Sequence, residues 1–210
     1  MSPRLPTLPV NLPGMLALGA YRPDVYMQLA ALADNMLRTS HPESTLIPSE
    51  REMIATYVSS LNRCNYCATI HGAVAAAHIC NANTESTGQD PETLKTKAEE
   101  TVNTICIRRD IAAEETEASP KLKRLLKIAS QVRDSGLNIT PEAVADAKES
   151  GATDMDIHDT VLIAALFCMF NRYVDGLTGA MPDDVEKLKG GGQMIADRGY
   201  AARTEAMKVD

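Results

Sequence analysis

Two cysteines and a histidine stand at helical spacing in the first half of the chain. Cys64, Cys67 and His71 are separated by three and four residues. Residues at these separations share one face of an α-helix, so the two thiols and the imidazole form a single stripe. A helix N-terminus and a nearby histidine both favour a thiolate, which is the reactive form of cysteine. The spacing therefore predicts dithiol redox chemistry, with the thiol pKa values lowered toward neutrality.

A disulfide between these two cysteines would be easily reduced. The Cβ atoms of helical neighbours lie about 5–6 Å apart, whereas a disulfide needs roughly 3.5–4.5 Å. Closing a Cys64–Cys67 bond must therefore tighten the first turn of the helix, and strained disulfides are the labile ones. This favours a catalytic couple over a structural cross-link. We expect these two thiols to be the only pair that forms a reversible intramolecular disulfide.

A carboxylate on the preceding predicted helix is a candidate partner for the histidine. Glu52 lies twelve residues before Cys64. If the two helices pack antiparallel, its carboxylate approaches His71, where it can orient the imidazole and relay a proton. The other interpretation is a capping box, in which Ser49 and Glu52 close the N-terminus of their own helix. The sequence leaves both interpretations open.

A zinc site is the alternative to redox chemistry. Cys64, Cys67 and His71 are ligand types that zinc accepts, and Glu52 or His78 could supply a fourth ligand. Structural zinc sites usually draw their ligands from two separate segments, however, and here three are crowded on one helix. The redox interpretation is therefore preferred, and no metal or cofactor is expected. For His78 itself, a buried or interface position is the favoured interpretation.

The other three cysteines carry no comparable pattern. Cys106 and Cys168 stand among apolar residues, where a free cysteine commonly acts as a small buried side chain. Cys80 closes the predicted helix that carries the dithiol, and its role stays open.

Composition and charge exclude several classes of protein. The chain has 210 residues, of which 44% are hydrophobic and 23% charged, and its formal net charge is −7. An acidic chain repels phosphate backbones, so nucleic acid is not an expected partner. No apolar run approaches the roughly 20 residues of a membrane span, and no secretory signal opens the chain. Five cysteines, an odd number, argue against a disulfide scaffold. We expect a cytoplasmic protein that binds no membrane.

Helix signals recur along the chain, and strand alternation is absent. Prolines and Ser, Thr or Asp caps mark the helix starts, and glycines mark several ends. The predicted helices cover approximately residues 23–36, 49–58, 64–80, 91–109, 120–135, 141–150 and 153–176. A polar loop is predicted over 81–90. The fold class is therefore all-α.

Two terminal segments frame the predicted helical domain of residues 23–181. Residues 1–22 carry four prolines and read as an extended arm, which cannot fold on its own. Residues 182–210 contain three consecutive glycines and are also interpreted as an arm. Because neither arm has an evident partner in a compact bundle, we expect a homo-oligomer.

The sequence resembles a known family. The run Ser49-Glu-Arg-Glu-Met-Ile54, followed by Cys64-x-x-Cys67-x-x-x-His71-Gly72, is similar to the AhpD-like alkylhydroperoxidases of the carboxymuconolactone decarboxylase superfamily. The chain length, the proline-bearing arm and the late segment Phe170–Gly176 most resemble its peroxidase-related branch. The similarity is strong over residues 46–80 and weaker over 155–180.

This resemblance implies a fold, a reaction and a role for each residue. The fold would be an AhpD-like helical bundle that assembles into homo-oligomers and needs no cofactor. Cys67 would be the thiolate that a hydroperoxide oxidises to a sulfenic acid, and Cys64 would resolve it as a disulfide. His71 and Glu52 would form the proton relay. The implied partners are a hydroperoxide substrate and an external dithiol reductant.

The chain departs from the family pattern at one position. Tyr66 stands where the well-studied peroxidase members carry a histidine just before the second cysteine. A phenol that titrates near 10 cannot replace an imidazole as a base at neutral pH. The departure argues against fast peroxidase turnover but affects the dithiol assignment less. Lactone decarboxylation, the activity of the superfamily's namesake, needs no CxxC motif, so the motif argues against it.

Overall fold

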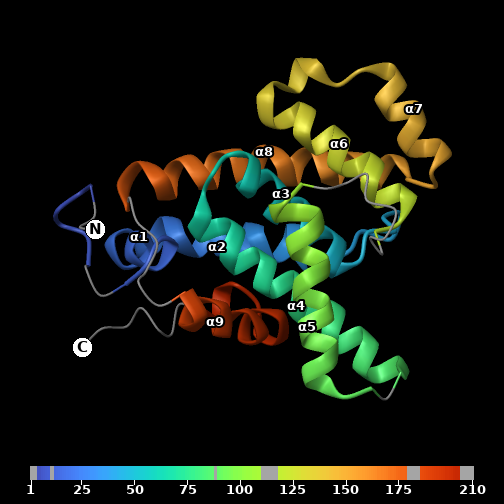
Figure 1. The fold of residues 1–210 in the computed structure, drawn as a ribbon. Coiled ribbons are helices and arrows are strands. Elements are labelled where there is room, and N and C mark those ends of the chain that lie inside the picture. Colours follow the sequence, from blue (N-terminus) through green and yellow to red (C-terminus); the bar gives the residue numbers. More distant parts are fainter. Residues whose placement is uncertain (1–3, 10–11, 88, 110–117, 179–184, 204–210) are drawn as a thin grey trace.

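The computed structural model of the protein (Figure 1) describes residues 4–9, 12–87, 89–109, 118–178 and 185–203. All secondary structure in these ranges is helical, which confirms the predicted fold class. The elements are α1 (Met15–Tyr21), α2 (Pro23–Leu37), α3 (Pro48–Leu61), α4 (Asn65–Thr87), α5 (Pro91–Val102), the π-helix η1 (Asn103–Ile107), α6 (Pro120–Asp134), the 3₁₀ turn η2 (Gly136–Asn138), α7 (Pro141–Glu149), α8 (Asp154–Leu177) and α9 (Val185–Arg198).

Most helix starts lie where the sequence predicts them. Ser119 and Thr140 cap α6 and α7 through their hydroxyls, which accept hydrogen bonds from the backbone N–H of the third residue of each helix. At α8, the Thr153 hydroxyl accepts from the Asp156 N–H at 3.0 Å, and the Asp156 carboxylate accepts from the Thr153 N–H at 3.1 Å. This reciprocal pair is a capping box at the helix start that the sequence predicts at residue 153.

The predicted capping box of α3 is wrong. The helix begins at Pro48, so Glu50 rather than Glu52 is the third helical residue, and its carboxylate accepts from the Ile47 N–H at 3.3 Å. The reason is that a proline suits the first helical position, which moves the start one residue upstream of Ser49. Glu52 lies further inside the helix and is free to serve another partner.

The helix that carries the dithiol is longer than predicted. α4 continues to Thr87 through most of the segment predicted as a loop over 81–90. Within it, the Thr84 hydroxyl donates to the Cys80 carbonyl at 2.8 Å, a bond that keeps this polar residue inside the helix. Packing of α4 against α5 and α9 overrides the weak helix propensity of its asparagines and threonines.

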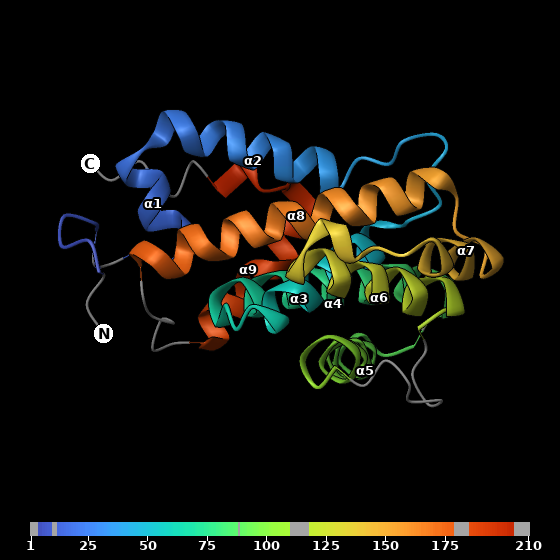
Figure 2. The same cartoon turned by 90° about the horizontal axis from the view of Figure 1, so that it is seen from above.

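α8 runs through the middle of the bundle. It contacts α2 on one side and α3 and α6 on the other, an arrangement that Figure 2 shows from above. By length and hydropathy α8 could cross a membrane, although the sequence suggested no such segment. However, 44% of its apolar window is buried inside the bundle, and the core helix of a soluble protein passes the same test.

The described parts of both terminal segments pack on their own chain. Residues 182–210, predicted as an arm, contain α9, which lies beside α4 in Figure 1 and buries Leu188 and Ile195. Close approach requires glycine there, because a Cβ on Gly192 would lie 2.8 Å from the Ala73 backbone. The prediction of an extended arm over residues 1–22 is wrong in part, because they contain the helix α1, and Leu8 before it is buried. Both segments thus have partners in the described part of the chain, so the homo-oligomer stays a prediction from the family resemblance alone.

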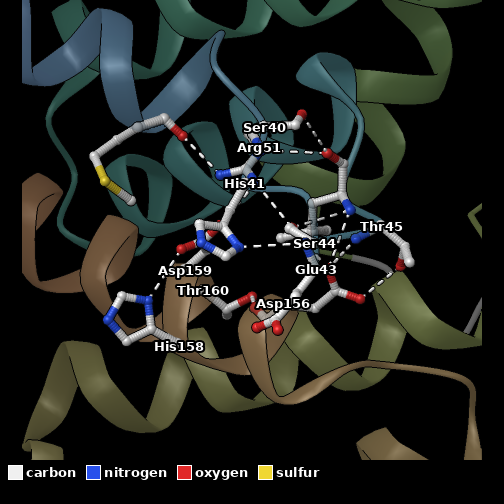
Figure 3. Close-up of polar contacts among 12 residues, drawn as sticks. Ser40, His41, Glu43, Ser44, Thr45, Arg51, Asp156, His158, Asp159 and Thr160 are labelled. Carbon is white, nitrogen blue, oxygen red and sulfur yellow. Dashed lines mark hydrogen bonds and ion pairs between the residues drawn. The ribbon is translucent and has the colours of Figure 1, made fainter.

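A buried polar cluster fixes the connection between α2 and α3 onto α8 (Figure 3). The Asp156 carboxylate accepts from the Ser44 hydroxyl at 2.8 Å and from the Thr45 N–H and hydroxyl, both at 2.6 Å. Beside it, the Arg51 guanidinium forms a buried ion pair of 2.7 Å with Asp159. Because Arg51 lies on α3 next to Glu52, this cluster also sets the position of the helix that carries the candidate relay.

Asp156→Asn is expected to lower the free energy of unfolding by about 2 kcal/mol, because an amide cannot accept all of these hydrogen bonds. Burial alone would raise the Asp156 pKa, but the hydrogen bonds from Thr45, Thr153 and Ser44 outweigh it and lower the pKa from 3.8 to about 2. The carboxylate therefore contributes its full stability above about pH 4, and this contribution is lost as the pH falls toward 2.

Urea unfolding of the wild type and Asp156→Asn between pH 2 and pH 7 checks both statements. The difference between the two proteins should shrink below about pH 4. Asp154→Asn is the matched control, because that carboxylate is exposed at the start of α8 and pairs only with Lys148 among the described residues. A control as destabilised as Asp156→Asn would contradict the assignment.

Candidate active site

A tight break between α3 and α4 positions the dithiol. Asn62 ends α3, and Arg63 adopts a left-handed conformation with φ of 61°. The chain then turns back, so that the Cys64 N–H donates to the Ser59 carbonyl at 3.0 Å, while the Cys64 carbonyl accepts from the Ala68 N–H at 2.9 Å. Cys64 is thus the residue directly before α4, and Cys67 lies in its first turn, as the sequence indicates.

The two thiols differ in environment. Cys64 is completely buried, whereas Cys67 is 3% exposed and lines a cavity. A hydrogen bond with Cys67 and burial raise the pKa of Cys64, and a hydrogen bond with the Asp175 carboxylate acts in the same direction. The predicted lowering of the pKa is therefore wrong for Cys64. The hydrogen bond with Cys67 and the removal of the thiolate from water together outweigh the helix dipole, which stabilises charge only modestly.

Glu52 and His71 meet in the interior, as the antiparallel interpretation predicts. The Glu52 carboxylate is fully buried, and its Oε2 lies 2.8 Å from Nδ1 of His71. A third residue joins them. The Tyr200 hydroxyl donates to Glu52 Oε1 at 2.6 Å and lies 2.8 Å from the same His71 nitrogen. Phe167 packs edge-on against the imidazole, with ring centroids 4.5 Å apart.

These contacts select one tautomer of the histidine. An ionised carboxylate only accepts hydrogen bonds, so Nδ1 of His71 carries the proton that faces Glu52. The Tyr200 hydroxyl has one proton, which it donates to the other oxygen of the Glu52 carboxylate. Nε2 of His71 is then unprotonated and can take up a proton, as in the carboxylate–histidine pairs that orient catalytic bases.

Cys67 and His71 open onto the same small cavity of about 40 Å³. This volume accommodates a group of a few non-hydrogen atoms. The lining residues are Met15, Tyr26, Leu29, Ala30, Ala33, Tyr66, Cys67, Ile70, His71, Phe170, Tyr200 and Arg203. The cavity is thus formed by α1, α2, α4, α8 and the residues that follow α9. Cys64 does not line it, so a ligand in the cavity meets Cys67 first.

Tyr66, the departure from the family pattern, belongs to this cavity. Its ring packs so closely on Gly14 that a Cβ there would lie 2.5 Å from ring atoms, and the φ of 50° at Gly14 also favours glycine. Burial raises the pKa of Tyr66, so its phenol is a neutral hydroxyl at physiological pH. It is therefore no base, as the sequence predicts.

Tyr200 and Arg203 are site residues that sequence reasoning missed. Both follow α9, and Tyr200 lies 129 residues beyond His71 in the chain. No motif links them to the dithiol, because their approach depends on how α9 packs against α4. The cue in the sequence was weak, namely an aromatic and an arginine in a segment that otherwise reads as a polar tail.

The remaining candidate groups do not line this cavity. The thiol of Cys106 is buried, donates to the Met53 carbonyl at 3.4 Å and has a pKa raised by burial. Cys168 lies partly buried near Asn62. Burial lowers the pKa of His78. Among the described residues, no three His, Cys, Asp or Glu side chains form a group suited to a metal ion, so the zinc alternative gains no support from this arrangement.

Comparisons with known proteins agree with this architecture. Residues 23–84 match the carboxymuconolactone decarboxylase family. A peroxidase-related protein from Ralstonia eutropha JMP134, described as an alkylhydroperoxidase AhpD core, is 22% identical with a TM-score of 0.64; the match covers 86% of this chain and 81% of that one. A peroxidase-related protein from Silicibacter sp. TM1040 is 22% identical with a TM-score of 0.61, covering 80% and 75%. Comparison with curated proteins gave no match.

The part of the chain that is similar to the carboxymuconolactone decarboxylase family therefore holds the dithiol, His71 and Glu52, and the chain has an AhpD-like fold.

Proposed function

We propose that this chain is a thiol-dependent, peroxidase-type oxidoreductase that reduces hydroperoxides with a Cys64–Cys67 dithiol/disulfide couple. The observation that carries the proposal is the common cavity of Cys67 and His71, together with the hydrogen bonds of Glu52 and Tyr200 to that histidine. A nucleophile, a base and a group that orients the base are the parts that such a reaction requires.

In the first step His71 takes the Cys67 proton on Nε2, and the thiolate attacks the terminal oxygen of the hydroperoxide. The O–O bond breaks, Cys67 becomes a sulfenic acid, and the leaving alkoxide takes a proton from His71 to give an alcohol. Glu52 and Tyr200 hold the imidazole and stabilise its positive charge between the two proton transfers.

In the second step the Cys64 sulfur attacks the sulfenic sulfur of Cys67, and water leaves as the disulfide forms. An external dithiol then reduces this disulfide by two electrons and restores both thiols. The raised pKa of Cys64 agrees with this order of steps. Cys64 stays protonated, so it does not compete with Cys67 for the peroxide.

Thiol counting on the reduced protein before and after one equivalent of peroxide tests the proposal. We expect the loss of two thiols per chain and a single disulfide between Cys64 and Cys67, located by mass spectrometry of peptides. A dithiol reductant should restore both thiols. A disulfide that includes Cys80, Cys106 or Cys168, or no change in the thiol count, would refute the proposed function.

A further inference from the structure

A buried arginine lines the same cavity as Cys67. Arg203 is only 8% exposed, and its side chain is among those that enclose the space beside Cys67 and His71. Within the described residues, no aspartate or glutamate lies within ion-pair distance of it, and the neighbours that raise the pKa of its guanidinium are Tyr66, Tyr26 and Tyr200. Glu205 and Asp210 lie outside the described residues.

The tyrosines cannot neutralise this arginine at physiological pH. Burial raises the pKa of Tyr26 to about 12 and also raises the pKa of Tyr66, so both phenols stay uncharged. The Tyr66 hydroxyl is near enough to the guanidinium for each group to shift the pKa of the other. Its buried oxygen has no hydrogen-bond partner of ordinary geometry in the described part of the chain.

The cavity thus contains a permanent cation and an unused hydroxyl donor. No aspartate or glutamate lines it, and both oxygens of the nearby Glu52 are already bonded by His71 and Tyr200. A buried cation without a counter-ion is unfavourable, and an anion that enters the cavity would remove this cost. Arginine is suited to that task because its planar guanidinium matches a carboxylate.

We propose that this cavity binds the carboxylate group of a small substrate, with Arg203 as the counter-ion and the Tyr66 hydroxyl as a second donor. This inference rests on the proposed function, in which the substrate is a hydroperoxide. The two together give a short aliphatic hydroperoxide that carries a carboxylate as the substrate class. The side chains of Leu29, Ile70 and Phe170 in the lining suit the aliphatic link. Arg203 then holds the substrate while its peroxide faces Cys67.

Acetate binding to the full-length reduced protein is the test. Acetate is titrated by calorimetry at constant ionic strength in sodium chloride, and acetamide serves as the uncharged analogue of the same shape. We expect saturable binding of acetate and none of acetamide. Arg203→Gln should weaken acetate binding by about tenfold or more, since charged hydrogen bonds are among the strong ones. Arg203→Lys should restore part of the affinity.

Arg22→Gln is the matched control, because Arg22 is an exposed arginine paired with Asp24 at the start of α2. It should bind acetate like the wild type. Cys67→Ser should also bind acetate, so a failure of the peroxide reaction would leave this result intact. The inference would be overturned if the wild-type protein did not bind acetate, or if Arg203→Gln bound acetate with unchanged affinity.

Alkylation of Cys67 gives a second measurement that needs no variant. Iodoacetate carries a carboxylate, and iodoacetamide is its neutral counterpart. The ratio of their rates at Cys67 in the folded protein should exceed the ratio for the same cysteine in urea-unfolded protein. A folded ratio equal to or below the unfolded one would mean that the cavity does not favour carboxylates.

Discussion

Replacing Cys67 with serine is expected to abolish peroxide-driven disulfide formation and to slow the oxidation of the remaining Cys64 by about two orders of magnitude or more. Cys64 is fully buried, does not line the cavity and has a raised pKa, so its thiolate is scarce and shielded from peroxide. With Cys64→Ser, in contrast, Cys67 should still be oxidised, and its sulfenic acid should persist because no resolving thiol remains.

A dimedone-type reagent measures this order of events, because it traps sulfenic acids covalently. The two single variants are treated with the same peroxide, and the labelled residue is located by peptide mass spectrometry. Cys106→Ser serves as the control, since that buried thiol bonds to the Met53 carbonyl away from the cavity. Equal labelling of Cys64 and Cys67, or faster labelling of Cys64, would show that the roles assigned to the two thiols are wrong.

Glu52→Gln is expected to slow the oxidation of Cys67 by about a hundredfold while the fold is kept. Glutamine has the same shape, but it cannot accept hydrogen bonds from His71 and Tyr200 with the strength of a carboxylate. It also provides no negative charge to stabilise the imidazolium that forms when Cys67 loses its proton. Tyr200→Phe, which removes one hydrogen bond to Glu52, should have a smaller effect in the same direction.

The rate of sulfenic acid formation in a Cys64→Ser background measures these effects as a function of pH. The dependence of this rate on pH should differ between Glu52→Gln and the wild type, because the hydrogen-bond partner of His71 has changed. Glu50→Gln is the matched control on the same helix; its carboxylate caps the Ile47 N–H and pairs with Lys121. Unchanged oxidation in Glu52→Gln would eliminate the relay, and equal loss in Glu50→Gln would indicate a structural effect of α3.

The sequence by itself determined the helical fold and the local arrangement of the dithiol. Helix starts at Pro120, Pro141 and Thr153 depend on groups within a few residues, so local signals suffice to find them. The same holds for Cys64, Cys67 and His71, because the stripe that they form requires only the regular geometry of one helix. The family resemblance covers this same segment.

Only the tertiary structure decided which groups surround that stripe. Spacing could not distinguish a capping role of Glu52 from a relay role; the packing of α3 against α4 brings Glu52 to His71. Tyr200 and Arg203 reach the cavity because Gly192 lets α9 approach α4 closely, a contact between segments far apart in the chain. The pKa of Cys64 is likewise raised by burial and by its neighbours, which a helix N-terminus alone does not reveal.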